Sequence, residues 1–113
     1  MHTAQPMERV LLHSKLHRIN VTQVEIDYEG SCALDTNFIH AGNMTEYEKV
    51  EIYNVTNGER FSTYLIAAEA GSKTVSINGA AAHKASPEDI IIICSYASMP
   101  EDQVLYHKPT LVY

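Results

Sequence analysis

The segment Lys49–Ala67, KVEIYNVTNGERFSTYLIA, contains the clearest β pattern in the sequence. Residues Lys49–Val55 alternate between polar and apolar side chains, which is the pattern of a half-buried β-strand. Asn57-Gly58 is the dipeptide favoured in two-residue type I′ turns, and Arg60–Ala67 follows as a second strand-like run. The stretch therefore predicts an antiparallel β-hairpin.

Most of the chain on either side of this hairpin is also strand-like. Val10–Tyr28 fits two β segments, and the isoleucines Ile90–Ile93 predict a central strand that is buried on both faces. The other expected elements are strands at Thr74–Ile77 and Thr110–Tyr113, a short helix capped by Asp35 and ended by Gly42, and a second short helix from Pro100. The pattern predicts a small, mainly β domain with short helices and leaves a β-barrel and a β-sandwich open.

Length and charge limit the classes of function. The chain has 113 residues, which fits a single domain spanning 1–113. Its formal net charge is −6 with only eight Lys and Arg, so no nucleic-acid partner is expected. No signal-peptide core or membrane-length apolar run occurs, and Cys32 and Cys94 share no metal or redox spacing. We therefore predict a cytoplasmic protein with reduced thiols and no membrane partner.

A polar break at Tyr28–Cys32, YEGSC, lies between the second strand-like run and the first predicted helix. Because Gly30 has no side chain and tolerates unusual backbone angles, the Ser31 hydroxyl can attack the Gly30 carbonyl in an N-to-O acyl shift. Gly-Ser is a common dipeptide, so this hypothesis of self-cleavage depends on the rest of the chain.

Two other local patterns have chemical interest. His13, Lys15 and His17 have the same parity, so a regular strand would point them to one cationic face, either a solvated face or an anion site. His13 and His17 are also spaced as a metal pair on a helix, but the strand prediction removes that geometry and no metal site is expected. Asn78–His83, NGAAAH, is a loop or single helical turn whose small residues allow close backbone approach.

Five segments of the sequence, taken together, resemble the sequence motifs of one protein family. They are Lys15–Arg18, Tyr28–Cys32, Asn54–Gly58, Arg60–Tyr64 and Asn78–His83. In order and spacing they resemble the pyruvoyl-dependent aspartate 1-decarboxylases, and the similarity continues through Ala97–Met99, so that it covers about Met7 to Tyr113. The resemblance implies a six-stranded double-psi β-barrel, assembled as a homotetramer with active sites between subunits.

The resemblance also implies how the cofactor arises. Family members are made as an inactive proenzyme in which the equivalent of Ser31 attacks the carbonyl of Gly30. Elimination and hydrolysis then leave a pyruvoyl group and ammonia, so the expected products are residues 1–30 and 31–113. Thr63 and Asn78 match positions that assist this step, although turn or strand structure also accounts for either residue alone. The need for a maturation factor is left open.

The implied reaction is decarboxylation of L-aspartate to β-alanine and carbon dioxide, which supplies β-alanine for pantothenate and coenzyme A biosynthesis. Loss of the α-carboxylate leaves electrons at Cα, and a Schiff base to the pyruvoyl group from Ser31 accepts them without pyridoxal phosphate or metal. Tyr64 is the expected proton donor. The expected substrate-binding residues are Lys15, His17, Arg60, Thr63, Gly79, Ala80 and Ala81.

Arg60 and Tyr64 are separated by about 13 Å along an extended strand. A bulge, or contributions from adjacent subunits, would let both reach one small substrate, and the second option predicts obligate oligomerisation. Two rival hypotheses are a self-cleaving hydrolase with a free N-terminal Ser31 as nucleophile, and an uncut, non-enzymatic β-barrel that binds an anionic partner. Residues 1–6 precede the resembling region, and Tyr53 stands where some relatives have tryptophan.

Overall fold

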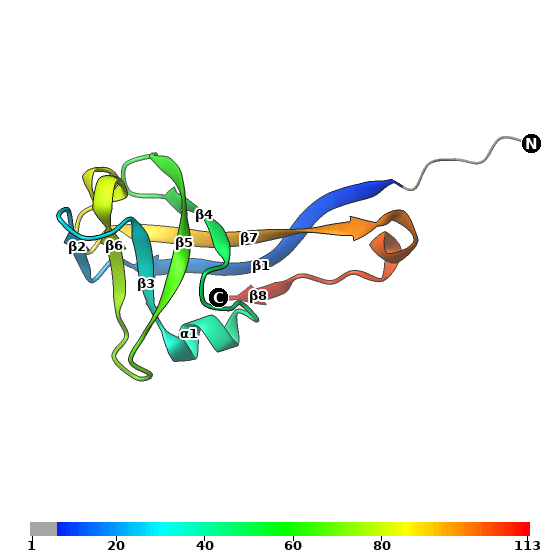
Figure 1. The fold of residues 1–113 in the computed structure, drawn as a ribbon, viewed down its shortest axis with the longest axis horizontal. Coiled ribbons are helices and arrows are strands. Elements are labelled where there is room, and N and C mark those ends of the chain that lie inside the picture. The colour runs from blue at the N-terminus through cyan, green and yellow to red at the C-terminus, as the bar shows by residue number, and fades with distance from the viewer. Residues whose placement is uncertain (1–6) are drawn as a thin grey trace, which may run out of the picture.

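The computed structural model describes residues 7–113, and its strands form one hydrogen-bonded sheet in the order β2-β6-β3-β5-β4-β7-β1-β8. The strands are β1 (Glu8–Asn20), β2 (Gln23–Glu25), β3 (Ser31–Asp35), β4 (Lys49–Asn54), β5 (Arg60–Ala68), β6 (Val75–Asn78), β7 (Ile90–Pro100) and β8 (Thr110–Val112). The helices are α1 (Thr36–Ala41) and the 3-10 helices η1 (Gly79–Lys84) and η2 (Glu101–Tyr106). Figure 1 shows a body from which paired ends of β1 and β7 extend as an arm. The prediction of a mainly β fold with short helices is confirmed.

Six of the eight strands in residues 7–113 have four or more residues, whereas β2 and β8 have three each. Backbone hydrogen bonds at Val21 link the connection between β1 and β2 to the residues just before β7. Val21 N donates to Asp89 O at 2.9 Å, and Glu88 N donates to Val21 O at 2.8 Å. These two bonds connect the segment after β1 to the segment before β7, at the end of the molecule away from the arm. Closure of the sheet into a double-psi barrel stays a prediction.

The predicted hairpin is formed by β4 and β5, but its turn is not the predicted two-residue type I′ turn. Pairing ends at Tyr53↔Arg60, so six residues form the connection. Type I′ geometry needs positive φ at both central residues, and only Gly58 has it, at +80°. The Asn54 side chain organises a wider turn instead, because its Oδ1 accepts hydrogen bonds from the N–H groups of Thr56 and Asn57.

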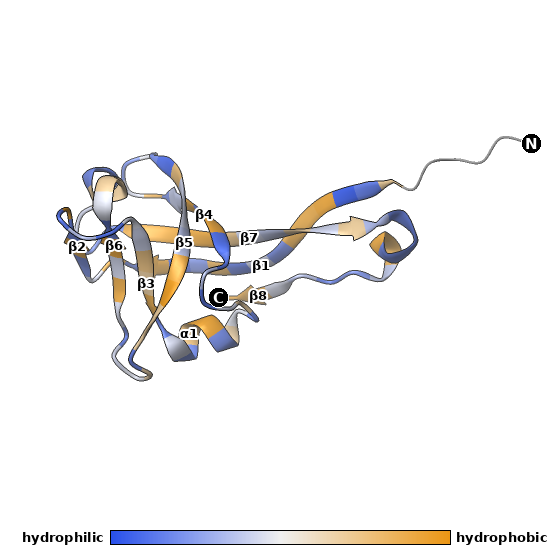
Figure 2. Cartoon of the chain, viewed as in Figure 1, coloured by the Kyte–Doolittle hydropathy of each residue, from blue (hydrophilic) through white to orange (hydrophobic). Residues whose placement is uncertain are grey.

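Strand β7 supplies much of the core. Ile91 and Ile93 are completely buried, whereas Ile90 and Ile92 are half-buried, so the predicted burial on both faces is only partly correct. The strand lies between β4 and β1, as expected of an interior strand. Figure 2 shows its hydrophobic half inside the body and a paler half along the arm.

The segment after Ser31 is a strand, whereas the sequence predicted a break that leads directly to a helix. Cys32 and Leu34 are completely buried, and β3 pairs in parallel with β5 and antiparallel with β6. A five-residue strand with no alternating pattern is recognisable only from these long-range partners. The helix α1 then begins after Asp35 and ends at Gly42, as predicted.

Asp35 connects α1 to the loop before β6. Its carboxylate accepts hydrogen bonds from the backbone N–H groups of Asn37 at 2.7 Å, Lys73 at 2.7 Å and Gly71 at 3.2 Å. Burial alone raises the pKa of Asp35, but these three hydrogen bonds outweigh it and hold the pKa below its ordinary value. The side chain is therefore a buried carboxylate that organises two loops.

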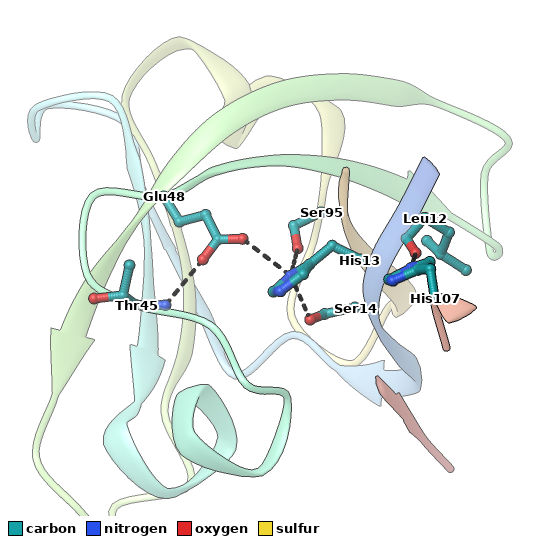
Figure 3. Close-up of polar contacts among 7 residues, drawn as sticks. All are labelled: Leu12, His13, Ser14, Thr45, Glu48, Ser95 and His107. Carbon is teal, nitrogen blue, oxygen red and sulfur yellow. Dashed lines mark hydrogen bonds and ion pairs between the residues drawn. The ribbon is translucent and has the colours of Figure 1, made fainter. Parts of the chain in front are cut away.

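Irregularities in β1 overturn the predicted cationic face. The register with β7 shifts between Leu12 and Ser14 and again between Leu16 and Ile19. An extra residue at a bulge breaks the alternation of side chains, so the expectation that His13, Lys15 and His17 share one face is wrong. Figure 3 shows what His13 does instead. Its Nδ1 lies 2.9 Å from Ser14 Oγ, 3.2 Å from Ser95 Oγ and 3.7 Å from Glu48 Oε2.

Candidate active site

Ser31 is the first residue of β3 and is completely buried. It pairs with Asn78 across the antiparallel ladder with β6, which brings their side chains to the same face. Ser31 Oγ donates a hydrogen bond to Glu29 O at 3.2 Å and accepts one from Asn78 Nδ2 at 3.0 Å. The hydroxyl expected to attack the chain is thus held by a buried amide, next to the peptide bond it would attack.

Gly79 packs directly on Gly30. A Cβ at position 79 would lie 2.6 Å from Gly30 Cα and 2.8 Å from Gly30 N, and φ of Gly79 is +75°. By contrast, φ of Gly30 is not positive, and a Cβ there would meet no atom within 4 Å. The special backbone predicted for Gly30 is therefore found at Gly79, whose missing side chain allows η1 to approach the Cα and N atoms of Gly30.

Ala80 and Ala81 follow Gly79 in η1, where Ala80 is exposed and Ala81 is half-buried. The sequence predicted a loop or a single helical turn at this point, and the short 3-10 helix agrees with that prediction. The three small residues lie just beyond Asn78, so the end of β6 contacts Ser31 and the start of η1 contacts Gly30.

Thr63 and Tyr64 lie on β5, beside β3. Cys32 of β3 pairs with Leu65 of β5. Ser31 directly precedes Cys32 and Tyr64 directly precedes Leu65, so Ser31 and Tyr64 lie at the same level on adjacent strands. The side chains of Thr63 and Tyr64 are half-buried, and within residues 7–113 no hydrogen bond joins either of them to Ser31 or Gly30. The structure therefore places them near the level of Ser31 without showing a contact.

Arg60 is at the other end of the same strand. Its guanidinium carbon lies 4.3 Å from the centre of the Tyr53 ring, and the Tyr53 hydroxyl lies 2.8 Å from the Tyr96 hydroxyl. The register of β5 with β4 is unbroken from Tyr64 to Arg60, which excludes the bulge that would bring these two residues together. They remain about 13 Å apart along one extended strand.

Lys15 and His17 lie on β1, which is separated from β5 in the sheet by β4 and β7. Lys15 pairs with Cys94 and Leu111. The His17 ring packs edge-on against Tyr113 at 5.3 Å, and its buried Nδ1 has no hydrogen-bond partner in the described part of the chain. Within one chain, the structure gathers Gly30, Ser31, Asn78 and Gly79, and it does not bring the cationic residues to them.

A cavity of about 420 Å³ opens beside Asn78. It is lined by residues of β2, β3, β5 and β6 and the neighbouring loops, namely Gln23, Glu25, Tyr28, Ala33, Ile66, Ala67, Thr74, Ser76 and Asn78. None of these side chains is cationic, so an anionic ligand would need positive charge from elsewhere. Ser76 and Tyr28 were not predicted as site residues, although Ser76 has the same parity as Asn78 and therefore shares its face.

The two cysteines are poor nucleophiles in this structure. Burial raises the pKa of the Cys32 thiol to about 12 and also raises the pKa of Cys94. Both are free thiols. Ser31 and Cys32 are adjacent possible nucleophiles at the start of β3. Of the two, Ser31 is the one whose side-chain oxygen is oriented by a hydrogen bond from Asn78.

Residues 7–113 contain no cluster of potential metal ligands and no membrane-length helix. No three His, Cys, Asp or Glu side chains in that range lie close enough to hold a metal ion. No helix in the same range is long and apolar enough to cross a membrane.

The chain is similar over nearly its whole length to proteins of known family. The family model described as aspartate decarboxylase matches residues 7–113. The aspartate 1-decarboxylase of Tolumonas auensis is 54% identical over 107 residues, which cover 95% of this chain and 85% of that protein. The one from Methylobacillus flagellatus is 55% identical over 107 residues with the same coverages. The one from Ralstonia pickettii is 54% identical over 106 residues, covering 94% of this chain and 88% of that protein.

Proposed function

The chain belongs to the aspartate decarboxylase family, and from this premise we propose that it removes the α-carboxylate of L-aspartate through a carbonyl group made from its own Ser31. The products are β-alanine and carbon dioxide, and the enzyme is a carboxy-lyase. The observation that carries the proposal is the buried Ser31 hydroxyl, which is oriented by Asn78 and follows Gly30, the residue that Gly79 approaches closely.

Self-processing begins with attack of Ser31 Oγ on the carbonyl carbon of Gly30. The C–N bond breaks, the nitrogen of Ser31 takes the hydroxyl proton, and an ester joins Gly30 to Oγ. Loss of the proton on Cα of Ser31 then expels the carboxylate of Gly30. Water converts the resulting enamine to a keto group and releases ammonia. The chain is thereby divided into residues 1–30 and 31–113.

The surroundings of Ser31 fit the bond changes that make such a keto group. Oγ leaves with the Gly30 carboxylate, and Asn78 Nδ2, which donates a hydrogen bond to Oγ, is placed to stabilise negative charge on that leaving group. When present, the pyruvoyl group supplies the electron sink that decarboxylation needs, and neither metal nor pyridoxal phosphate is part of the proposal.

The other residues bind and protonate the substrate. The planar guanidinium of Arg60 can hold a carboxylate through two hydrogen bonds, and Lys15 and His17 add positive charge. Thr63 and the start of η1, from Gly79 to Ala81, complete the binding site. The phenol of Tyr64 donates a proton to Cα.

We further propose that the active enzyme is a homotetramer whose sites lie between subunits. This is supported by the separation of Lys15 and His17 on β1 from Arg60 on β5. It is also supported by large apolar side chains exposed on the arm and the C-terminal segment, namely Val10, Tyr96, Leu105, Tyr106, Leu111 and Tyr113. Sedimentation velocity on the active enzyme tests this, and a fully active, stable monomer would contradict it.

The proposed cellular setting is the cytoplasm, where the enzyme supplies β-alanine for pantothenate synthesis. The free thiols of Cys32 and Cys94 support a reducing compartment.

The direct test of the function is conversion of carbon-labelled L-aspartate to β-alanine and carbon dioxide by the purified chain. The Ser31→Ala variant, which cannot form the carbonyl, should show no conversion. Treatment of the wild-type enzyme with a hydrazine, which reacts with ketones, should abolish activity. Equal activity of wild type and Ser31→Ala would overturn the proposal.

A further inference from the structure

A series of hydrogen bonds runs from Ser76 through Asn78 and Ser31 to the Glu29 carbonyl. Ser76 Oγ donates to Asn78 Oδ1 at 2.7 Å, Asn78 Nδ2 donates to Ser31 Oγ at 3.0 Å, and Ser31 Oγ donates to Glu29 O at 3.2 Å. The side chains of Ser76, Asn78 and Ser31 are at most 4% exposed. Ser76 and Asn78 lie two residues apart on β6 and so point to the same face as Ser31 across the ladder.

The direction of these bonds determines what the Asn78 amide does. With Oδ1 bound to Ser76, its N–H group faces Ser31 and can stabilise negative charge as Oγ loses its proton. A flipped amide would present its oxygen to Ser31 instead and compete with Glu29 for the hydroxyl proton. It would also leave the buried Ser76 hydroxyl without an acceptor, because Asn78 Oδ1 is its only acceptor among residues 7–113.

We propose that Ser76 is a positioning residue for self-processing, which acts on Ser31 by fixing the orientation of the Asn78 amide. This inference rests on the function proposed above, since it concerns the same cleavage at Ser31. Ser76 itself does not take part in the bond changes. Its hydroxyl fixes which end of the amide faces the reacting oxygen.

The test compares two substitutions of nearly the same shape. Ser76→Thr keeps the hydroxyl, whereas Ser76→Val replaces it with a methyl group. Ser76 lines the cavity of about 420 Å³, so there is room for the extra methyl group in both variants. Freshly purified, uncut protein is incubated, and the fraction cleaved between residues 30 and 31 is followed by intact mass. We expect Ser76→Thr to be cleaved at a rate close to that of wild type and Ser76→Val about 10-fold more slowly.

Two controls separate orientation from stability. Ser76→Ala removes the hydroxyl without adding bulk and should be slowed as much as Ser76→Val. Ser95→Ala removes another buried strand hydroxyl, 1% exposed, which contacts His13 and not Asn78. It should be cleaved at the wild-type rate even if its melting temperature falls.

The outcomes distinguish this inference from the function on which it rests. If wild type is not cleaved at Ser31, the proposed function itself fails. If wild type is cleaved and Ser76→Val matches its rate, only the role of Ser76 is refuted. If Ser76→Thr is as slow as Ser76→Val, the size of the side chain and not its hydroxyl controls the reaction, which also refutes it.

Discussion

Gly79→Ala should reduce the rate of self-cleavage by much more than a loss of folding stability would explain. The new Cβ would lie 2.6 Å from Gly30 Cα, which is about 0.8 Å short of the 3.4 Å at which ordinary contact begins. The other close atoms are backbone, so Gly30 or η1 must move by a comparable distance. A displacement of this order at reacting atoms costs about 100-fold in rate. We therefore expect cleavage between Gly30 and Ser31 to be about 100-fold slower.

The matched control is Gly58→Ala. Gly58 has φ of +80°, close to the +75° of Gly79, but a Cβ there would meet no atom within 4 Å. Both variants incur the cost of a left-handed backbone, about 1–2 kcal/mol of folding free energy. Only Gly79→Ala also places a Cβ against Gly30, next to the bond that is cleaved. Thermal melts measure the shared cost, and a time course of intact mass measures cleavage. Cleavage of Gly79→Ala at the rate of Gly58→Ala would refute the role assigned to the close approach.

Two other predictions concern the substrate site and the acid stability of the fold. Tyr53→Leu removes the aromatic ring under Arg60 and should raise KM for aspartate about 5-fold. Tyr53→Phe keeps the ring, so its KM should stay near that of wild type. An unchanged KM for Tyr53→Leu would contradict this prediction. The lowered pKa of Asp35 contributes stability that is fully present above the unfolded pKa, about 3.9, and is lost as the pH falls through the folded value. Asp35→Asn should therefore melt at a lower temperature at pH 7 and lose less on acidification than wild type, and parallel melting curves of the two proteins against pH would show this reasoning to be wrong.

The parts of the fold that were predictable have a local cause. The hairpin of β4 and β5 follows from alternation over Lys49–Val55, which any half-buried strand needs. Its turn was not predictable, because the Asn54 side chain replaces the backbone bonds of a tighter turn. The strand β3 was missed because its partners, β5 and β6, lie more than 30 residues away along the chain.

Some residues of the candidate site were also predictable from the sequence, and others were not. Ser31, Asn78 and Gly79 were chosen through family resemblance, and the structure brings them together around Gly30. Ser76 was missed, although parity alone places it on the face of Asn78. The bulge at His13 left no mark in the sequence, because an extra residue in one strand is visible only against its partner.

The intact mass of the purified chain under denaturing conditions shows directly whether Ser31 becomes a pyruvoyl group. We expect two fragments, residues 1–30 and residues 31–113, with the second lighter by one ammonia than a fragment that begins with serine. Ser31→Ala should remain a single uncut chain. A wild-type chain that stays whole, a second fragment that begins with unmodified serine, or cleavage of Ser31→Ala at the same bond would contradict the account.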